Sequence, residues 1–460
     1  MIQQHSPISE HKHYSLQNAV AQHFTGKYLW GNGAVSGSKS AVWNGSKELR
    51  PLSLIECRED RDVQVALQIA QEYDVPVSVL AGGHDPFVRS VRDGAMVLDM
   101  RSNNQVVFDG HQRLVRIGGG TLTGDVLRNL PPEEVIVTGT FSTVGLAGFT
   151  MGGGYGRLSS YFGLALDQLA EATVVLADGR LVQASADSEP DLFWALRGGG
   201  GNFGVVTSMS FRVHSVASLL TALIFFPLQY AKSAMLQLQE EIDTARDNTS
   251  YFSGFMTSQS GDPVFFLAPL WIGDRAQGEA LITRLSTWDG AQVIQQGWSH
   301  YRVLFSEAFE QQWPKGSQYQ LNVQNVSRIT NEVADILIEG ARRFTSSASS
   351  VVIHDFHGAA STISSSETAF AMRENHYTMQ IIAGWKADSE SADRHQDWAE
   401  NLSKELSKLA LPGAYVNLLH PDEISRVRQF YGPSTKRLLK IKEQYDPLNV
   451  FRAPGSLIAG

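Results

Sequence analysis

The first half of the chain alternates short apolar segments with amphipathic ones. Residues 51–57 and 75–80 are short and apolar, and the second of them is rich in β-branched residues, which is typical of buried strands. Between them, apolar residues recur at the i, i+3, i+4 and i+7 positions of a helix. These residues are Val63, Ala66, Leu67 and Ala70. The pattern predicts a strand, a helix and a second strand.

The same alternation predicts further elements up to residue 215. We expect a helix opened by Thr123 and a hairpin whose turn is Asp178-Gly179, a dipeptide typical of tight hairpins. The other expected elements are strands at 95–100, 103–109 and 113–120 and a helix at 189–197. The first half is therefore predicted to form a unit rich in alternating strands and helices.

Beyond residue 215 the apolar segments become longer. Residues 219–228, 250–258 and 263–273 resemble long strands, and helical stretches such as 232–245 separate them. This order predicts an antiparallel sheet covered on one side by helices, and thus an α+β fold. The end of the chain, residues 424–451, is expected to be helical up to a turn at Asp446-Pro447.

Length, charge and cysteine content narrow the class of protein. A chain of 460 residues exceeds what one core usually supports, so we expect two domains. The net charge of −9, without a strongly basic run, argues against nucleic acid or an anionic membrane as partner. No signal-peptide core or membrane-length apolar segment is visible, which predicts a soluble cytoplasmic protein. A single cysteine, Cys57, excludes both a disulfide framework and a cysteine-rich metal site. We interpret Cys57 as a packing residue.

Glycine is concentrated in four clusters of the first half. They are Gly82-Gly83, residues 118–120, residues 139–156 and residues 198–204. The last cluster contains GxGxxG, but a predicted helix precedes it and a predicted strand follows, which is the reverse of a dinucleotide fingerprint. We therefore reject that match, and no nucleoside-triphosphate P-loop occurs either.

Glycines let main-chain N–H groups approach a ligand without a Cβ in the way. One such cluster alone is more often a tight turn. Four clusters in one βα-rich unit favour a long ligand that is contacted at several points. An isoalloxazine joined through a pyrophosphate to adenosine, as in FAD, fits better than a mononucleotide.

Several of these stretches resemble one family. VPVSVLAGGHD, RIGGG, GTFSTVGLAGFTMGGGYG and GGGGNFGVVT, in this order, together with the closing FYGPSTKRLLKIKEQYDPLNVF, are similar to FAD-linked oxidases of the vanillyl-alcohol oxidase and berberine-bridge-enzyme type. The resemblance covers roughly residues 45 to 455. It implies a PCMH-type FAD-binding domain formed by residues 1–215 and 420–460, and a substrate-binding domain formed by residues 216–419.

The resemblance also implies how the cofactor is attached. In this family the histidine of the GGH motif commonly carries FAD through a covalent bond to its 8α carbon, and His84 occupies that position. A neutral imidazole is a suitable nucleophile. The alternative is a packed or merely hydrogen-bonded histidine. Phe141 stands where doubly attached relatives have a second, cysteine link, so a single bond is expected.

The resemblance implies further contacts to FAD. Val79, Ala81, Gly82, Gly83, Asp85 and Ser90 belong to the expected pyrophosphate loop. Gly139, Ser142, Thr143, Gly145, Leu146, Gly148, Gly153, Tyr155 and Gly156 are expected along the ribityl chain and flavin, with Val206 near the adenine and Asn449 near the flavin or its entrance. Leu146 is the nearest match to a residue associated with oxygen access, and its bulk is expected to slow reoxidation.

The catalytic base has several candidates. The family's YxNY motif is retained in part, as Tyr415-Val416-Asn417-Leu418, which makes Tyr415 one candidate. In the strand at 350–358, the period of two places Asp355 and His357 on one face and His354 on the other. If the first face meets the flavin, Asp355 or His357 acts as base or binds substrate. The opposite directions of His354 and His357 argue against a metal site. The weaker candidates are Arg373, His376 and Tyr377.

These features predict an FAD-dependent oxidoreductase, with an oxidase favoured over a dehydrogenase. We expect a hydride to pass from a small neutral or hydrophobic substrate, such as an alcohol, an amine or a natural-product intermediate, to FAD, which O2 then reoxidises with release of H2O2. Two alternatives stay open. One is a flavin enzyme of oxidative cyclisation or rearrangement in natural-product synthesis, and the other is a non-catalytic FAD-fold binding protein.

Overall fold

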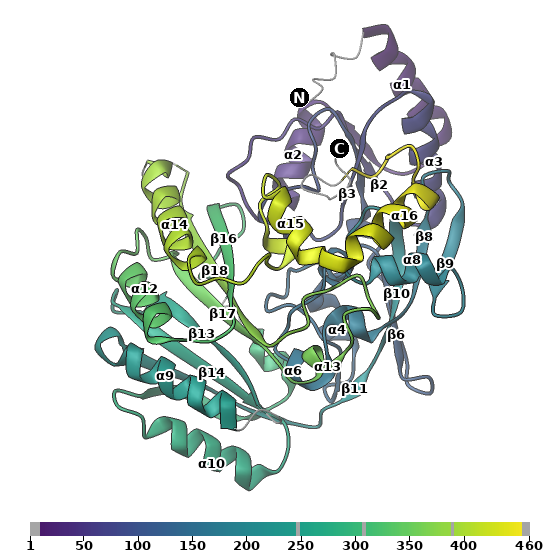
Figure 1. The fold of residues 1–460 in the computed structure, drawn as a ribbon. Coiled ribbons are helices and arrows are strands. Elements are labelled where there is room, and N and C mark those ends of the chain that lie inside the picture. The colour runs from purple at the N-terminus through teal and green to yellow at the C-terminus, as the bar shows by residue number, and fades with distance from the viewer. Residues whose placement is uncertain (1–9, 245–248, 306–309, 388–390, 453–460) are drawn as a thin grey trace.

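The computed structural model describes residues 10–244, 249–305, 310–387 and 391–452. The chain forms two parts that lie side by side (Figure 1). The first part, formed mainly by the N-terminal half, contains sheets of four, five and two strands, and the second part contains one large sheet. Within the described ranges, no helix has both the length and the apolar character that a membrane span requires.

The first small sheet has the strand order β1-β2-β4-β3. Its strands β2, β4 and β3 are parallel, and α3 connects β2 to β3 with its apolar stripe buried, as the sequence pattern predicts. The bounds are β1 Tyr28–Trp30, β2 Ser53–Glu56, α3 Asp60–Glu72, β3 Val77–Leu80 and β4 Met96–Asp99, with α1 Glu10–His23 packed against α3. Cys57 lies in the core of this unit.

The second small sheet has the order β5-β6-β10-β8-β9 and is antiparallel throughout. The prediction of βα alternation is therefore wrong beyond residue 100, because β5 and β6 pair directly. The hairpin at Asp178-Gly179 is confirmed, with Gly179 at φ +82°. Thr123 is the first residue of α4 and Leu122 precedes it as the cap. The bounds are β5 Val106–Asp109, β6 Leu114–Gly118, α4 Thr123–Asn129, β8 Leu169–Val175, β9 Leu181–Ser185, α8 Pro190–Leu196 and β10 Val205–Arg212.

Shorter elements connect these sheets. They are α2 Asn32–Ala41, β7 Glu134–Val135, α5 Leu146–Met151, α6 Ser159–Phe162, α7 Ala165–Gln168 and β11 His214–Ser215. Of these, β7 and β11 form a two-stranded sheet. The start of α5 and the loop before it carry much of the third glycine cluster.

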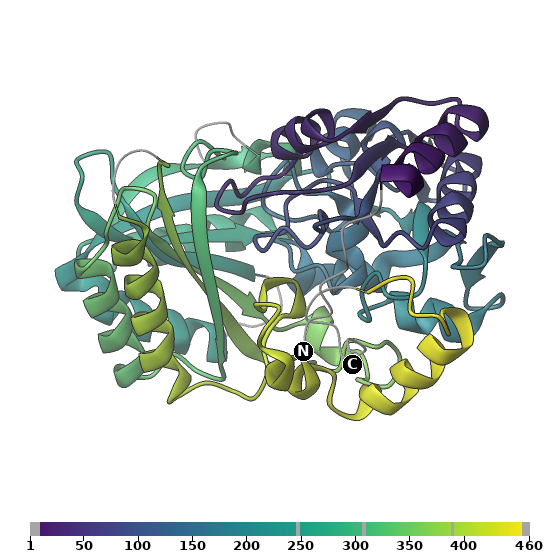
Figure 2. The ribbon, with the colours of Figure 1, turned by 90° about the horizontal axis from the view of Figure 1, so that it is seen from above.

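The large sheet has seven antiparallel strands in the order β15-β12-β14-β13-β17-β18-β16. Its strands are β12 Leu219–Pro227, β13 Thr249–Thr257, β14 Pro263–Trp271, β15 Gln292–Ser299, β16 Gln318–Val326, β17 Ser350–Phe356 and β18 His376–Trp385. Helices α9 Leu228–Thr244, α10 Arg275–Ser286, α12 Asn331–Arg342 and α14 Ala392–Ser407 cover its outer face, as predicted (Figure 2). The other face is turned toward the first part.

The C-terminal segment returns to the first part. Helix α15 spans Ile424–Tyr431, and α16, Thr435–Tyr445, packs beside α8 (Figure 1). Two polar contacts join α16 to the start of α8, from Arg437 to Asp191 and from Tyr445 to Glu189. This return supports the division that we propose, with residues 1–215 and 420–460 as one domain and 216–419 as the other.

Candidate functional site

A cavity of about 420 Å³ lies where the two parts meet. The first part contributes the loop after β3, the loop before α5 and the glycines at 200–204, and the large sheet contributes side chains of β16, β17 and β18. The segment 415–418 closes a further side. Three of the four glycine clusters therefore meet in one place, and Gly119 brings the fourth to its wall.

Two glycine loops cross at the cavity without room for side chains. A Cβ on Gly82 would lie 2.3 Å from the backbone nitrogen of Gly145. The next residue, Gly83, has φ +67°, and its Cβ would lie 2.4 Å from the carbonyl oxygen of Ala41. Only glycine fits at both positions. These contacts fix the backbone that presents His84.

The His84 imidazole is held between aromatic rings. It stacks on Trp43 at 5.1 Å between ring centroids, and Phe141 lies at 5.4 Å. Its Nε2 atom is enclosed and has no hydrogen-bond partner among the described residues. Burial lowers the pKa of His84 to about 4, so the ring is neutral at physiological pH.

Other polar atoms on the cavity wall lack partners as well. Ser90 Oγ and Asn202 Oδ1 are buried and, within the described part of the chain, unpaired. Buried polar groups are usually hydrogen-bonded. Three such atoms, on segments far apart in sequence, fit a long ligand that contacts all three, as FAD would.

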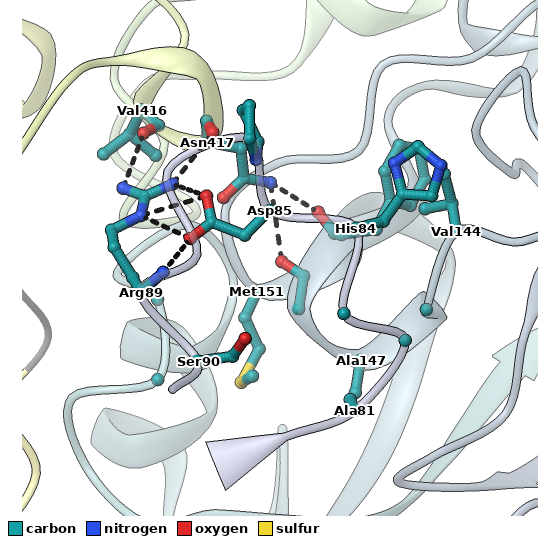
Figure 3. A pocket seen from close by; sticks show the side chains of 18 of the residues that line it. Ala81, His84, Asp85, Arg89, Ser90, Val144, Ala147, Met151, Val416 and Asn417 are labelled. Carbon is teal, nitrogen blue, oxygen red and sulfur yellow. Dashed lines mark hydrogen bonds and ion pairs between the residues drawn. The ribbon is translucent and has the colours of Figure 1, made fainter. Parts of the chain in front are cut away.

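Arg89 connects the His84 loop to the segment 415–418. Its guanidinium binds the Asp85 carboxylate at 2.7 Å and donates to the carbonyl oxygen of Asn417 at 2.9 Å. Figure 3 shows the guanidinium between Asp85 and the backbone of Val416 and Asn417. The loop that carries His84 is thus tied to the segment that carries Tyr415.

Tyr415 lines the cavity, and its hydroxyl oxygen accepts two hydrogen bonds. The donors are the Gly154 N–H at 3.0 Å and the Asn417 amide at 2.9 Å. Burial raises the pKa of Tyr415 to about 12, although both hydrogen bonds act in the opposite direction by favouring the ionised form. The ring of Tyr155 lies 4.4 Å away.

Asp355 and His357 lie outside this cavity, which corrects the sequence expectation. They line a separate space of about 40 Å³ near α9. Asp355 accepts a hydrogen bond from the Tyr251 N–H at 2.8 Å, and His357 Nε2 lies 3.1 Å from the Thr249 carbonyl oxygen. Burial raises the pKa of Asp355. The face of β17 that meets the cavity is the one that carries His354.

The three weaker candidates have structural surroundings. His376 lies between the Tyr155 hydroxyl and the Glu374 carbonyl oxygen, at 2.8 and 2.7 Å. Arg373 pairs with Asp167. Tyr377 belongs to the core between the large sheet and its helices.

Most residues that were expected to contact FAD lie at the cavity. They are Val79, Ala81, Gly82, Gly83, His84, Asp85, Ser90, Gly139, Gly145, Gly148, Tyr155 and Val206. Among the described lining residues we do not find Ser142, Thr143, Leu146, Gly153, Gly156 and Asn449.

Local contacts account for four of these six absences. Ser142 binds the carboxylate of Glu310 through its N–H and its hydroxyl. Leu146 is fully buried in the core. Gly156 faces the carbonyl oxygen of Thr138, and Gly153 packs against Phe370 and Tyr415.

Sequence reasoning missed several residues of the wall. They are Trp43, Arg89, Asn202, Trp313, His354 and Gln380 as lining groups. Asn202 lies in the glycine cluster at 198–204 and His354 in the strand predicted at 350–358, so the sequence contained a signal for both. Trp43 and Trp313 lie in stretches without a recognisable pattern, and only the fold brings them together.

The chain matches known proteins in both of its terminal regions. Residues 51–185 match the FAD binding domain model, and residues 414–458 match the model described as berberine and berberine like. YvdP of Bacillus subtilis, described as an uncharacterized FAD-linked oxidoreductase, is 28% identical over 438 residues, which cover 90% of this chain and 94% of the relative. (R)-6-hydroxynicotine oxidase of Paenarthrobacter nicotinovorans is 36% identical over 182 residues, 39% of this chain and 40% of the relative.

The solved structures agree with the fold. The crystal structure of 6-hydroxy-D-nicotine oxidase from Arthrobacter nicotinovorans superposes with a TM-score of 0.84 at 23% identity, covering 94% of this chain and 97% of that one. BBE-like 1 of Physcomitrella patens has a TM-score of 0.85 at 22% identity, covering 96% and 98%. The resemblance inferred from the glycine motifs and the α+β fold with a PCMH-type FAD-binding domain are confirmed. The chain therefore contains a region that matches the FAD binding domain model and a C-terminal region that matches the berberine-like model, and over most of its length it is similar to FAD-linked oxidoreductases.

Proposed function

We propose that this protein is an FAD-dependent oxidase that carries FAD on His84 through one covalent bond. Its substrate would be a small neutral or hydrophobic alcohol or amine. When bound, FAD supplies the hydride acceptor and passes the electrons to O2, which leaves as H2O2. The residues of the chain bind, orient and deprotonate the substrate.

The observation that carries the proposal is the unpaired Nε2 atom of His84. The His84 imidazole lines the cavity and is neutral, and its buried Nε2 atom has no hydrogen-bond partner among the described residues, which supports a role as nucleophile. The stacked Trp43 ring and the two crossing glycine loops hold it in one orientation. Such a group is poised for a bond to a ligand in the cavity.

A single bond is favoured because the cavity contains no thiol. Phe141 lines the cavity beside His84. Cys57, the only cysteine of the sequence, is buried in the core below the first sheet. Burial also raises the pKa of Cys57, which makes it a poor nucleophile.

The geometry around Leu146 favours an oxidase over a dehydrogenase. Gly145, Ala147 and Gly148 line the cavity, whereas the Leu146 side chain is packed in the core. The small lining residues leave space for O2. Because the Leu146 side chain does not narrow the cavity, its position supports the proposal of an oxidase.

Tyr415 is the base that we propose for the substrate O–H or N–H proton. Of the three predicted catalytic residues, it is the one that lines the cavity. Its oxygen accepts hydrogen bonds from Gly154 and Asn417, which stabilise negative charge on the phenolate form. A relative named (R)-6-hydroxynicotine oxidase supports amines as one substrate class to be tested.

The experiment compares wild type with His84→Ala and with the exposed-site control His111→Ala. Acid-precipitated wild type and control should stay yellow, and their intact mass should exceed that of the polypeptide by one FAD. His84→Ala should bind FAD only reversibly. A flavin-loaded wild type with the mass of the bare polypeptide would overturn the covalent bond.

The activity is tested separately by mixing the protein with panels of alcohols and amines. Bleaching of the flavin followed by peroxide on reoxidation is the result expected of an oxidase. Bleaching without peroxide would indicate a dehydrogenase, and a cyclised or rearranged product would indicate the natural-product alternative. A protein that binds no flavin would favour the non-catalytic binder.

A further inference from the structure

The part of the large sheet that lines the cavity is apolar apart from two side chains. Leu321 of β16 and Ile382 of β18 contribute hydrocarbon surface. The polar exceptions are His354 of β17 and Gln380 of β18. A pocket that is mostly apolar with a few polar groups recognises a ligand through those groups.

His354 and Gln380 are close neighbours on adjacent strands. In the register of β17 and β18, His354 is opposite Thr378 and Val352 is opposite Gln380. The two side chains are therefore diagonal partners on the same face, within reach of one small molecule.

The His354 ring packs edge-on against Phe252 at 4.9 Å between ring centroids, but the polar atoms of His354 and Gln380 are not taken up by the part of the protein that the structure describes. Among the described residues, no side-chain hydrogen bond or ion pair is found for His354 or Gln380. In contrast, His357 and His376 lie at hydrogen-bond distance from carbonyl oxygens. The hydrogen-bonding capacity of His354 and Gln380 is thus directed to the content of the cavity.

The sheet wall carries no charge. None of the charged side chains that line the cavity in the described part of the chain comes from the large sheet. They are Asp85, Arg89 and Arg92 of the first part and Arg452 near the C-terminus. Asp85 and Arg89 pair with each other. Burial, together with the nearby Arg157, lowers the pKa of His354 to about 3, so its ring is neutral. A charged substrate would find no counter-charge here.

Flat aromatic rings complete the enclosure. Trp43 is stacked on Tyr319 at 4.0 Å, and Phe141 meets Trp313 edge to face at 5.8 Å. These contacts hold the rings in fixed orientations. Trp43 already stacks with His84 and Tyr319, so a planar aromatic ligand would pair with the other lining rings, Phe141 and Trp313, where ring pairs add to the effect of apolar burial.

We propose that the substrate is an uncharged aromatic molecule with one or two hydrogen-bonding groups, which His354 and Gln380 bind. This inference rests on the proposed function, since it describes the substrate of that site. A saccharide is disfavoured because most of its hydroxyl groups would be buried without partners.

The test measures the affinity of the FAD-bearing protein for four probes from the change in flavin absorbance. The probes are benzyl alcohol, benzoate, benzylammonium and cellobiose. Benzyl alcohol should bind at least about tenfold more tightly than the other three. Gln380→Leu and His354→Leu should each weaken benzyl alcohol binding several-fold. The matched control, Gln295→Leu on the exposed strand β15, should leave it unchanged.

A charge-introducing variant sharpens the result. Gln380→Glu should make benzylammonium the preferred probe. The inference is overturned if cellobiose or a charged probe binds wild type more tightly than benzyl alcohol, if no probe binds, or if both leucine variants retain wild-type affinity. Failure of the proposed function is detected separately. It would appear as an intact mass without covalently bound FAD or as reoxidation without peroxide, and neither result changes the order in which the four probes bind.

Discussion

Gly82 and Gly145 touch backbone to backbone across the wall of the cavity. A Cβ on Gly82 would lie 2.3 Å from the Gly145 nitrogen, and a Cβ on Gly145 would lie 2.5 Å from the Gly82 nitrogen. The two residues belong to different glycine clusters of the sequence. Their contact holds the His84 loop against the start of α5 and explains why neither position carries a side chain.

The first prediction follows from this contact. Gly82→Ala should destabilise the fold by about 1–3 kcal/mol, because the added methyl group must push two backbones apart. It should also lower the fraction of protein that carries flavin. Gly297→Ala is the control, since a Cβ there meets nothing within 4 Å. Denaturant unfolding and the ratio of flavin to protein absorbance measure both effects, and equal behaviour of the two variants would contradict the close contact.

The second prediction separates Tyr415 from Asp355. Tyr415→Phe should lower kcat by about 10²- to 10⁴-fold, the range typical of general acid–base catalysis, while flavin content stays unchanged. Asp355→Asn should leave kcat near the wild-type value, because Asp355 faces the smaller space near α9. Steady-state kinetics over a pH series measures both. A large loss in Asp355→Asn with wild-type stability and flavin content would show that our assignment of the base is wrong.

The third prediction concerns acid sensitivity. Burial lowers the pKa of His354 to about 3 and that of His376 to about 4. Below pH 6.5 the unfolded chain binds protons at these positions that the folded chain does not. Their stabilising contribution is therefore fully present above pH 6.5 and is lost as the pH falls toward 4. Each histidine contributes a slope of about 1.4 kcal/mol per pH unit in the free energy of unfolding.

Urea unfolding at a series of pH values between 7 and 4.5 measures this slope. His354→Leu should reduce the slope by about 1.4 kcal/mol per pH unit, because one fewer proton is taken up on unfolding. The exposed-site variant His111→Gln should retain the wild-type slope. The same slope in His354→Leu and wild type would show that His354 is not held neutral by the fold.

The fourth prediction concerns a buried ion pair behind the cavity. The Lys442 ammonium binds Asp446 at 2.6 Å and donates to the carbonyl oxygens of Asn202 and Phe451, each at 2.8 Å. Lys442→Met should cost about 3–5 kcal/mol, because it leaves the carboxylate of Asp446 buried without its cation. Flavin retention should fall as well, since Asn202 and Phe451 line the cavity.

The exposed neighbour on the same helix provides the control. Lys440→Met should change the free energy of unfolding by less than about 0.5 kcal/mol. A similarly small effect of Lys442→Met would mean that the pair does not organise the wall.

Local patterns predicted most of the secondary structure and the cofactor. The period of 3.6 in residues 63–70 and the long apolar segments after residue 215 correspond to α3 and to strands of the large sheet. The glycine clusters and the GGH motif predicted an FAD-type ligand, because glycine at a cofactor wall is a property of the backbone and is visible in the sequence.

The pairing of strands was harder to predict from the sequence. The segments that became β5 and β6 were expected to continue the βα alternation, and they form an antiparallel hairpin instead. Strand propensity says that a segment is extended, whereas its direction relative to a neighbour depends on the connection and on what covers the sheet.

The sequence by itself determined that β17 has two faces, with His354 on one and Asp355 on the other, because side chains alternate along any strand. Only the tertiary structure decided which face meets the cavity. The helices α9 and α12 cover the Asp355 side, so the His354 side is left for the ligand. In the same way, Trp43 and His84 are 41 positions apart in the chain and stack only because two loops cross, a contact that no local pattern encodes.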